Sequence, residues 1–116
     1  MANEIRVQRI SDRIREILAD MLLREINDPR LAGINITDVT VDRELAYANI
    51  FVSCLEGSTR SKEILDGFKH ASGFIRHELA NRIDLRSFPR LRFHWDPTPE
   101  NADKIEKLIN ELHKDE

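Results

Sequence analysis

The chain has 116 residues, of which 41% are hydrophobic and 34% are charged, and its formal net charge is −3. This balance is typical of one compact domain and excludes a disordered chain, and no apolar run approaches the roughly 18 residues of a membrane span. The only cysteine, Cys54, excludes a disulfide framework and a paired-cysteine metal knuckle, so we expect a reducing cytoplasm as the setting.

The first predicted element is an amphipathic helix over residues 3–26. Asp28-Pro29 ends it, because proline lacks an amide hydrogen and disfavours helix in the residue before it. The apolar face repeats at three- and four-residue spacing through Ile10, Ile14, Ile17, Leu18, Met21 and Leu22. Three basic residues share another face, which we interpret as a solvated flank: Arg6, Arg9 and Arg13.

Two runs of alternating apolar and polar residues predict an antiparallel hairpin. The first run covers residues 34–41 and changes phase near Thr37-Asp38, which predicts a β-bulge. The second run covers residues 45–54 and places Cys54 on the buried side. We therefore interpret this thiol as a small core residue.

A long helical region follows a turn at residues 57–59 and ends near Ile83, and we expect Thr59 to cap its first turn. A third strand is predicted over residues 91–95, and Thr98-Pro99 predicts a final helix over about residues 100–113. The order α-β-β-α-α-β-α predicts an α+β fold with helices on one face of a three-stranded sheet. We expect a single domain over residues 1–116, with its core in 1–96 and a C-terminal helix or tail in 97–116.

One pentad, His77-Glu78-Leu79-Ala80-Asn81, is one residue short of the HExxH zinc-protease signature. That motif needs two histidines four residues apart, and Asn81 is a poor substitute for the second one. The sequence also has no nucleophile elbow, P-loop or dinucleotide-binding glycine motif. We therefore expect no metal, no cofactor and no catalytic residue.

The segment Ala71-Ser72-Gly73 weakens the long helical region, although the apolar four-residue rhythm continues on both sides of it. This pattern predicts two consecutive helices that meet at a kink. The second helix would begin with unpaired N–H groups that Ser72 caps, and Gly73 would allow a phosphate group to approach. The alternative interpretation is a tight crossing, in which Gly73 lets another helix come close.

Charge is distributed unevenly along the chain. Residues 60–92 carry eight lysines and arginines against four acidic residues, a net charge of +4, so the remainder carries −7. A basic segment of this kind can form one cationic face that binds nucleic-acid phosphates. Its candidate binding residues are Lys69, Ala71, Ser72, Gly73, Arg76, Arg82, Arg86, Arg90 and Arg92. The few aromatic candidates for base stacking are Phe74, Phe88 and Tyr47.

Three stretches of the chain, residues 6–31, 36–53 and 65–96, resemble the ribosome-binding factor A family. The Asp28-Pro29-Arg30 turn and the segment ASGFIRHEL are the most specific parts of this resemblance. It implies a type II KH-like fold, in which an Ala-x-Gly kink replaces the GxxG loop that clamps nucleic-acid backbone. In this sequence that kink is Ala71-Ser72-Gly73.

The resemblance further implies a non-catalytic, monomeric factor that binds the immature small (30S) ribosomal subunit and contacts its 16S rRNA. It implies a role in 16S rRNA processing and in cold adaptation, with no membrane and no small-molecule substrate as partner. About five phosphate contacts to RNA would give log K a slope near −3.5 against log salt. Family members often carry a longer charged C-terminal extension than the short acidic helix predicted here.

A second hypothesis is a protein–protein adaptor. In this alternative the acidic tail and the Arg6/Arg9/Arg13 face dock a ribosomal protein, and the kink is purely structural. An adaptor would bind ribosomal protein and not rRNA fragments.

Overall fold

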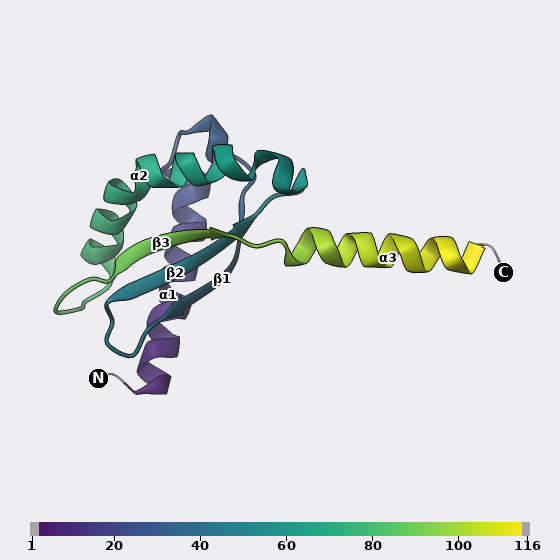
Figure 1. The fold of residues 1–116 in the computed structure, drawn as a ribbon. Helices are drawn as coiled ribbons and strands as arrows, with labels where there is room; N and C mark the ends of the chain where they lie inside the picture. The colour runs from purple at the N-terminus through teal and green to yellow at the C-terminus, as the bar shows by residue number, and fades with distance from the viewer. Residues whose placement is uncertain (1–2, 115–116) are drawn as a thin grey trace.

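The computed structural model describes residues 3–114, which form three α-helices and a three-stranded sheet (Figure 1). In chain order these are α1 (Glu4–Arg24), β1 (Asn35–Val41), β2 (Tyr47–Ser53), α2 (Ser61–Arg82), β3 (Arg90–Trp95) and α3 (Thr98–Lys114). Two 3-10 helices, η1 (Pro29–Leu31) and η2 (Gly57–Arg60), lie in the connections. The predicted α+β fold is confirmed, but the order differs from the prediction at one point, because α2 is one helix where two consecutive helices were expected. None of the helices within residues 3–114 has the length and apolar composition to span a bilayer.

The strands lie in the order β1-β2-β3, with β2 in the middle. β1 and β2 are antiparallel, as predicted, and β3 runs parallel to β2. The pairing of β1 with β2 shifts between Ile36 and Asp38, which confirms the predicted bulge. Because β3 pairs only with β2 among the described strands, its other edge is free.

The hydrophobic core lies between one face of the sheet and the helices α1 and α2, while no described helix covers the other face (Figure 1). Residues that are completely buried come from all three elements: Ile14, Leu18 and Met21 of α1, Ala48, Ile50 and Val52 of β2, and Ile64, Phe68, Ile75 and Leu79 of α2. The hydrophobic periodicity of the sequence therefore predicted the buried faces of both helices correctly.

Cys54 is buried in this core, as predicted. Its Sγ lies 3.6 Å from the carbonyl oxygen of Gly57, and burial raises the pKa of the thiol above 9.0. Because the thiolate is the nucleophilic form, a buried thiol that stays protonated at neutral pH is a packing residue.

The two long helices begin in different ways. Asn3 caps α1, because its Oδ1 accepts a hydrogen bond from the amide of Arg6 at 2.8 Å. The expectation that Thr59 caps α2 is wrong: its hydroxyl donates to the carbonyl of Glu56, and α2 begins at Ser61. The 3-10 helix η2 runs directly into α2 and leaves Arg60 at the cap position without a side-chain cap.

α2 changes direction within its length (Figure 1), but it is one continuous α-helix from Ser61 to Arg82. The free helix end expected at the kink is therefore absent. Ser72 does not cap amides as expected, because its hydroxyl donates to the carbonyl of Lys69 at 2.9 Å. Hydrogen bonds of this kind from serine to the preceding turn often accompany bent helices.

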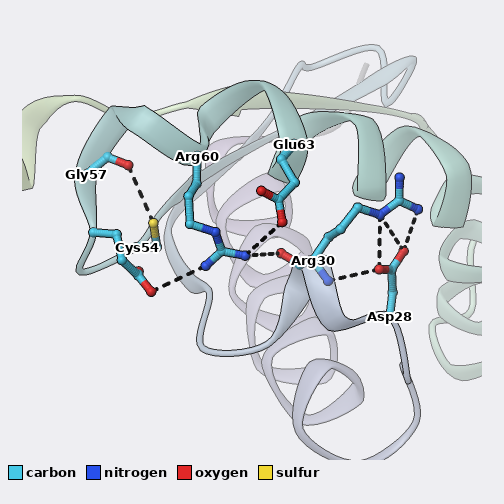
Figure 2. Close-up of polar contacts among 7 residues, drawn as sticks. Asp28, Arg30, Cys54, Gly57, Arg60 and Glu63 are labelled. Atoms are coloured by element: carbon cyan, nitrogen blue, oxygen red, sulfur yellow. Dashed lines mark hydrogen bonds and ion pairs between the residues drawn. The ribbon is translucent and has the colours of Figure 1, made fainter.

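The loop after α1 is attached to α2 at the η1–α2 junction, which consists of Asp28, Arg30, Leu31, Arg60, Glu63 and Gly67. Figure 2 shows the polar contacts of Asp28, Arg30, Arg60 and Glu63. Asp28 accepts a hydrogen bond from the Arg30 amide at 3.0 Å, and its carboxylate also contacts the Arg30 guanidinium at 2.7 Å. Arg60 in turn donates to the Arg30 carbonyl at 3.1 Å. This network explains why the sequence has aspartate and arginine on either side of the proline.

α3 projects away from the rest of the structure (Figure 1), which makes the described chain elongated, 60 × 34 × 20 Å. Glu100 attaches the N-terminal end of α3 to the domain: its carboxylate accepts hydrogen bonds from the Ser58 amide at 2.9 Å and from the Trp95 indole at 3.3 Å. After this first turn the apolar side of α3 is exposed, at Ile105, Leu108, Ile109 and Leu112.

Candidate nucleic-acid interface

A groove of about 430 Å³ lies between α2 and β3, and we call it the α2–β3 groove. Its apolar part includes Phe93, whose ring stacks on the buried ring of Phe68 with centroids 4.6 Å apart. The polar side chains at the groove belong to both elements. The residues that line it are Leu65, Asp66, Lys69 and Ser72 of α2, and Leu91, Arg92, Phe93 and His94 of β3.

The free edge of β3 forms one side of this groove. The amides of Arg90 and Asp96 each donate to carbonyls of β2 or the residue before it, at 2.8 Å. In a parallel ladder successive residues direct their N–H and C=O groups to opposite sides, so Leu91, Phe93 and Trp95 direct theirs away from β2. Leu91 and Phe93 therefore present backbone donors and acceptors toward the groove, where a ligand can use them.

The small residues of the expected kink have separate roles. Ser72 lines the groove, whereas Ala71 is half-buried and packs against the core. Gly73 is exposed, and a β-carbon built on it would meet nothing within 4 Å. The alternative interpretation of Gly73 as a helix-crossing site is therefore wrong within residues 3–114. The surface at Gly73 is open, as a phosphate contact requires, but no helix end supplies it with unpaired amides.

Two of the predicted phosphate-binding arginines are engaged within the fold. Arg76 donates to the carbonyl of Phe88 at 2.6 Å and to that of Pro89 at 3.1 Å, which fastens α2 to the loop before β3. Arg82 pairs with Glu25 and Glu78, and the hydrogen bond with Glu25 raises the pKa of its guanidinium. Both side chains have internal partners that a phosphate would have to displace.

Four other predicted cations are free of carboxylates. Lys69, Arg86, Arg90 and Arg92 are all exposed. None of them takes part in the ion pairs found among residues 3–114. Lys69 and Arg92 lie at the α2–β3 groove, and Arg86 lines a separate hollow with Arg6 and Arg43 near the hairpin turn. The structure thus brings together part of the predicted basic face and separates the rest.

The aromatic candidates have different surroundings. Phe88 is buried, so the prediction that it stacks on bases is wrong, whereas Phe74 is 48% exposed. Tyr47 lies beneath the guanidinium of Arg92, whose central carbon is 3.5 Å from the ring centroid. Sequence reasoning missed His94, which lines the groove; its place between Phe93 and Trp95 in an alternating strand was the available signal.

The pentad that resembles a zinc-protease motif is part of α2, with Leu79 in the core and both ends of the pentad at the surface. His77 and Asn81 are exposed, and their side-chain nitrogens are 3.3 Å apart. No group of three or more His, Cys, Asp or Glu side chains in the described range of 3–114 is arranged to hold a metal ion.

Comparison with known proteins gives a consistent result. A family model described as ribosome-binding factor A matches residues 6–109 of this chain. A relative from Syntrophobacter fumaroxidans, also called ribosome-binding factor A, is 42% identical over an alignment of 114 positions, and the match covers 96% of this chain and 97% of the relative.

Solved structures share the fold. The crystal structure of ribosome-binding factor A from Thermus thermophilus superposes with a TM-score of 0.68 and 20% identity, and the match covers 77% of this chain and 93% of that one. A model of the Thermus factor fitted into a cryo-EM map of its complex with the 30S subunit has a TM-score of 0.59 and 22% identity, covering 72% and 87% of the two chains.

Proposed function

The chain belongs to the ribosome-binding factor A family, and on that premise we propose that it binds the immature small (30S) ribosomal subunit in the cytoplasm by contacting 16S rRNA. In this proposal the protein is a non-catalytic, monomeric assembly factor that supports 16S rRNA processing and growth in the cold. The Thermus relative fitted into a 30S complex supports the choice of partner. The observation that carries the RNA contact is the α2–β3 groove, with Lys69 and Arg92 unpaired beside an apolar floor.

The groove suits a single RNA strand. Lys69 and the open surface at Gly73 would contact the phosphate backbone, because cations and small residues let phosphates come close. An unpaired base would lie on Leu91 and Phe93, where the free edge of β3 offers backbone donors and acceptors. Recognition of splayed bases in single-stranded regions is the usual way in which proteins read RNA.

The structure lowers the expected number of phosphate contacts. Arg76 and Arg82 already have partners within the fold, so Lys69, Arg86, Arg90 and Arg92 remain. Four contacts to single-stranded RNA give a slope of about −2.8 for log K against log salt, because each contributes about −0.7. A slope near zero in salt titrations with rRNA fragments would remove the electrostatic basis of the proposal.

Gly73→Glu gives a direct test of the groove. The position is open, so a glutamate fits without disturbing the fold, while its charge repels phosphates and screens Lys69. We expect binding to immature subunits, measured by co-sedimentation, to fall several-fold. Ala80→Glu is the matched control, because Ala80 is exposed two helical turns away on the same helix. Equal binding by the two variants would contradict an RNA contact at Gly73.

Co-sedimentation with immature subunits, mature subunits and bare 16S rRNA would identify the partner. We expect the largest bound fraction with immature subunits and salt-sensitive binding to bare RNA. The exposed apolar side of α3 favours a second candidate, the protein adaptor, because such a surface fits a protein partner. Binding to subunits without any binding to bare RNA would support that second candidate instead.

A further inference from the structure

One face of the sheet is covered by no described helix (Figure 1). The strand register places a group of planar side chains on that face. β2 contributes Tyr47, Asn49 and Phe51, and the register places these opposite Arg90, Arg92 and His94 of β3. All six point away from the core, because alternate residues of each strand, such as Ile50 and Phe93, face the helices. We call this group the open-face platform.

The guanidinium of Arg92 belongs to this platform and has an aromatic ring beneath it. It lies over the ring of Tyr47, 3.5 Å from the ring centroid, and the tyrosine is half-buried beneath it. No carboxylate forms an ion pair with Arg92 among the described residues, so aromatic support fixes its position. The other face of the guanidinium is directed to solvent, where a planar group can stack on it.

His94 repeats this arrangement on the next outward position of β3. Its ring stacks on Phe51 with centroids 5.0 Å apart and planes at 27°. Its Nε2 lies 2.9 Å from Asn49 Oδ1, a hydrogen bond that fixes the rotation of the imidazole. The platform therefore carries two nitrogen-rich groups, Arg92 and His94, each in contact with the face of an aromatic ring.

The charges around the platform indicate which partner it fits. Arg90, at the start of β3, adds a second guanidinium that forms no ion pair within residues 3–114. The carboxylates at the other end are engaged: Asp96 accepts from the Thr37 hydroxyl at 2.6 Å, and Asp38 accepts from the Val39 amide at 2.9 Å. An anionic partner with planar groups would thus lie over β3 and the start of β2.

The spacing selects unstacked bases. Arg92 and His94 are two residues apart in a strand, which separates them by about 6.6 Å. This is roughly twice the 3.4 Å rise per nucleotide of a stacked strand. Two neighbouring bases could stack on both planes only if they were splayed apart, as in single-stranded RNA.

We propose that the open-face platform binds two successive unpaired bases of single-stranded RNA by stacking on Arg92 and His94. This rests on the proposed function, and it assigns Arg92 to a base where the sequence suggested a phosphate. Arg92 and His94 also line the α2–β3 groove, so one RNA strand can pass around the free edge of β3 from the groove to the platform. The edge strand then contacts RNA on both sides.

The test compares Arg92→Lys with Arg90→Lys in filter binding to a short oligouridylate. Both variants keep the positive charge, but only Arg92→Lys loses a plane that lies on an aromatic ring. We expect Arg92→Lys to weaken binding about tenfold with an unchanged salt slope, in line with the loss of one stacked base. Arg90→Lys should bind like the parent protein.

Three further arms complete the experiment. Tyr47→Phe keeps the supporting ring and should bind normally, whereas Tyr47→Leu should weaken binding as Arg92→Lys does. An abasic oligomer of the same length should bind Arg92→Lys and the parent protein equally. The proposal would be overturned if Arg92→Lys lost affinity equally for the abasic and the normal oligomer. It would also be overturned if Arg92→Lys lost no affinity for the normal oligomer.

Lys69→Ala distinguishes RNA binding in the α2–β3 groove from RNA binding on the open-face platform. If Lys69→Ala weakens oligouridylate binding while Arg92→Lys does not, the groove stands and the platform fails. If the parent protein sediments with subunits but binds no RNA, both proposals fail. Urea unfolding of each variant would confirm that the exposed substitutions leave the fold intact.

Discussion

Arginine is common to the η1–α2 junction and to the region of the α2–β3 groove, but its partners differ. At the junction Arg30 contacts Asp28, and Arg60 contacts Glu56 and Glu63 (Figure 2). At the groove Arg92 has no carboxylate partner among residues 3–114 and lies on Tyr47 instead. The arginines at the junction thus stabilise the fold through carboxylate contacts, whereas Arg92 is available to contact an external anion.

Glycine shows the same contrast within one helix. A β-carbon on Gly67 would lie 3.0 Å from a methyl group of Leu31, because α2 packs closely on η1 there. A β-carbon on Gly73, six residues later, would meet nothing within 4 Å. The helix thus has one glycine that close packing requires and one that leaves a surface open.

Gly67→Val should have the largest effect on stability. The added methyl groups would collide with Leu31, and overpacking of this kind costs about 1–3 kcal/mol of the free energy of unfolding. Urea unfolding measures the change, provided that the m-value stays constant. Gly73→Val is the matched control and should change stability by less than about 0.5 kcal/mol. Equal destabilisation by both would contradict the contrast between the two positions.

Arg76→Ala should lower stability more than RNA binding, and Lys69→Ala should do the opposite. Arg76 binds the carbonyls of Phe88 and Pro89, so its loss should lower the free energy of unfolding by about 1 kcal/mol. Lys69 is exposed at the groove, so its loss should weaken RNA binding and leave unfolding nearly unchanged. Urea unfolding and filter binding on both variants check this. A larger RNA defect in Arg76→Ala than in Lys69→Ala would reverse the assignment.

Acid should weaken the η1–α2 junction by protonating Asp28. Hydrogen bonds from the Arg30 side chain, and then from its amide, hold the pKa of Asp28 below 3.8. Because the pKa is lower in the folded state, this pairing stabilises the fold above pH 3.8 and is lost as the pH falls through the folded-state pKa. Carboxyl-detected NMR should therefore place the Asp28 midpoint below 3.8.

The control for this titration is a pair of substitutions. Arg30→Gln should return the Asp28 midpoint toward 3.8, since it removes the largest cause of the shift. Arg92→Gln, at the groove, should leave the midpoint where it is. A midpoint that moves equally in the two variants would mean that general charge, rather than the Arg30 hydrogen bonds, lowers the pKa of Asp28.

Periodicity in the sequence was sufficient to predict the strands, the bulge near Thr37 and the buried Cys54. These features depend on which face of an element each residue occupies, and alternation along the chain records that directly. The parallel pairing of β3 with β2 was not specified, because it depends on where the chain returns after α2.

The site was predicted less completely, because side-chain partners depend on residues far apart in the chain. Arg82 pairs with Glu25, 57 positions away, and no local pattern shows that contact. Ser72 had two possible hydrogen-bonding roles, and the unbroken helix selected donation to Lys69. The basic residues were recognised correctly as a group, but their separation into engaged and free members required the fold.

Trp95 lies at the end of β3 and donates its indole N–H to Glu100 in the first turn of α3. It is the only tryptophan of the chain, so tryptophan emission from this protein comes from one known place. Movement of α3 away from the sheet would break that hydrogen bond and change the solvation of the indole. Stopped-flow fluorescence could therefore time the reorientation of α3 during docking without any added dye.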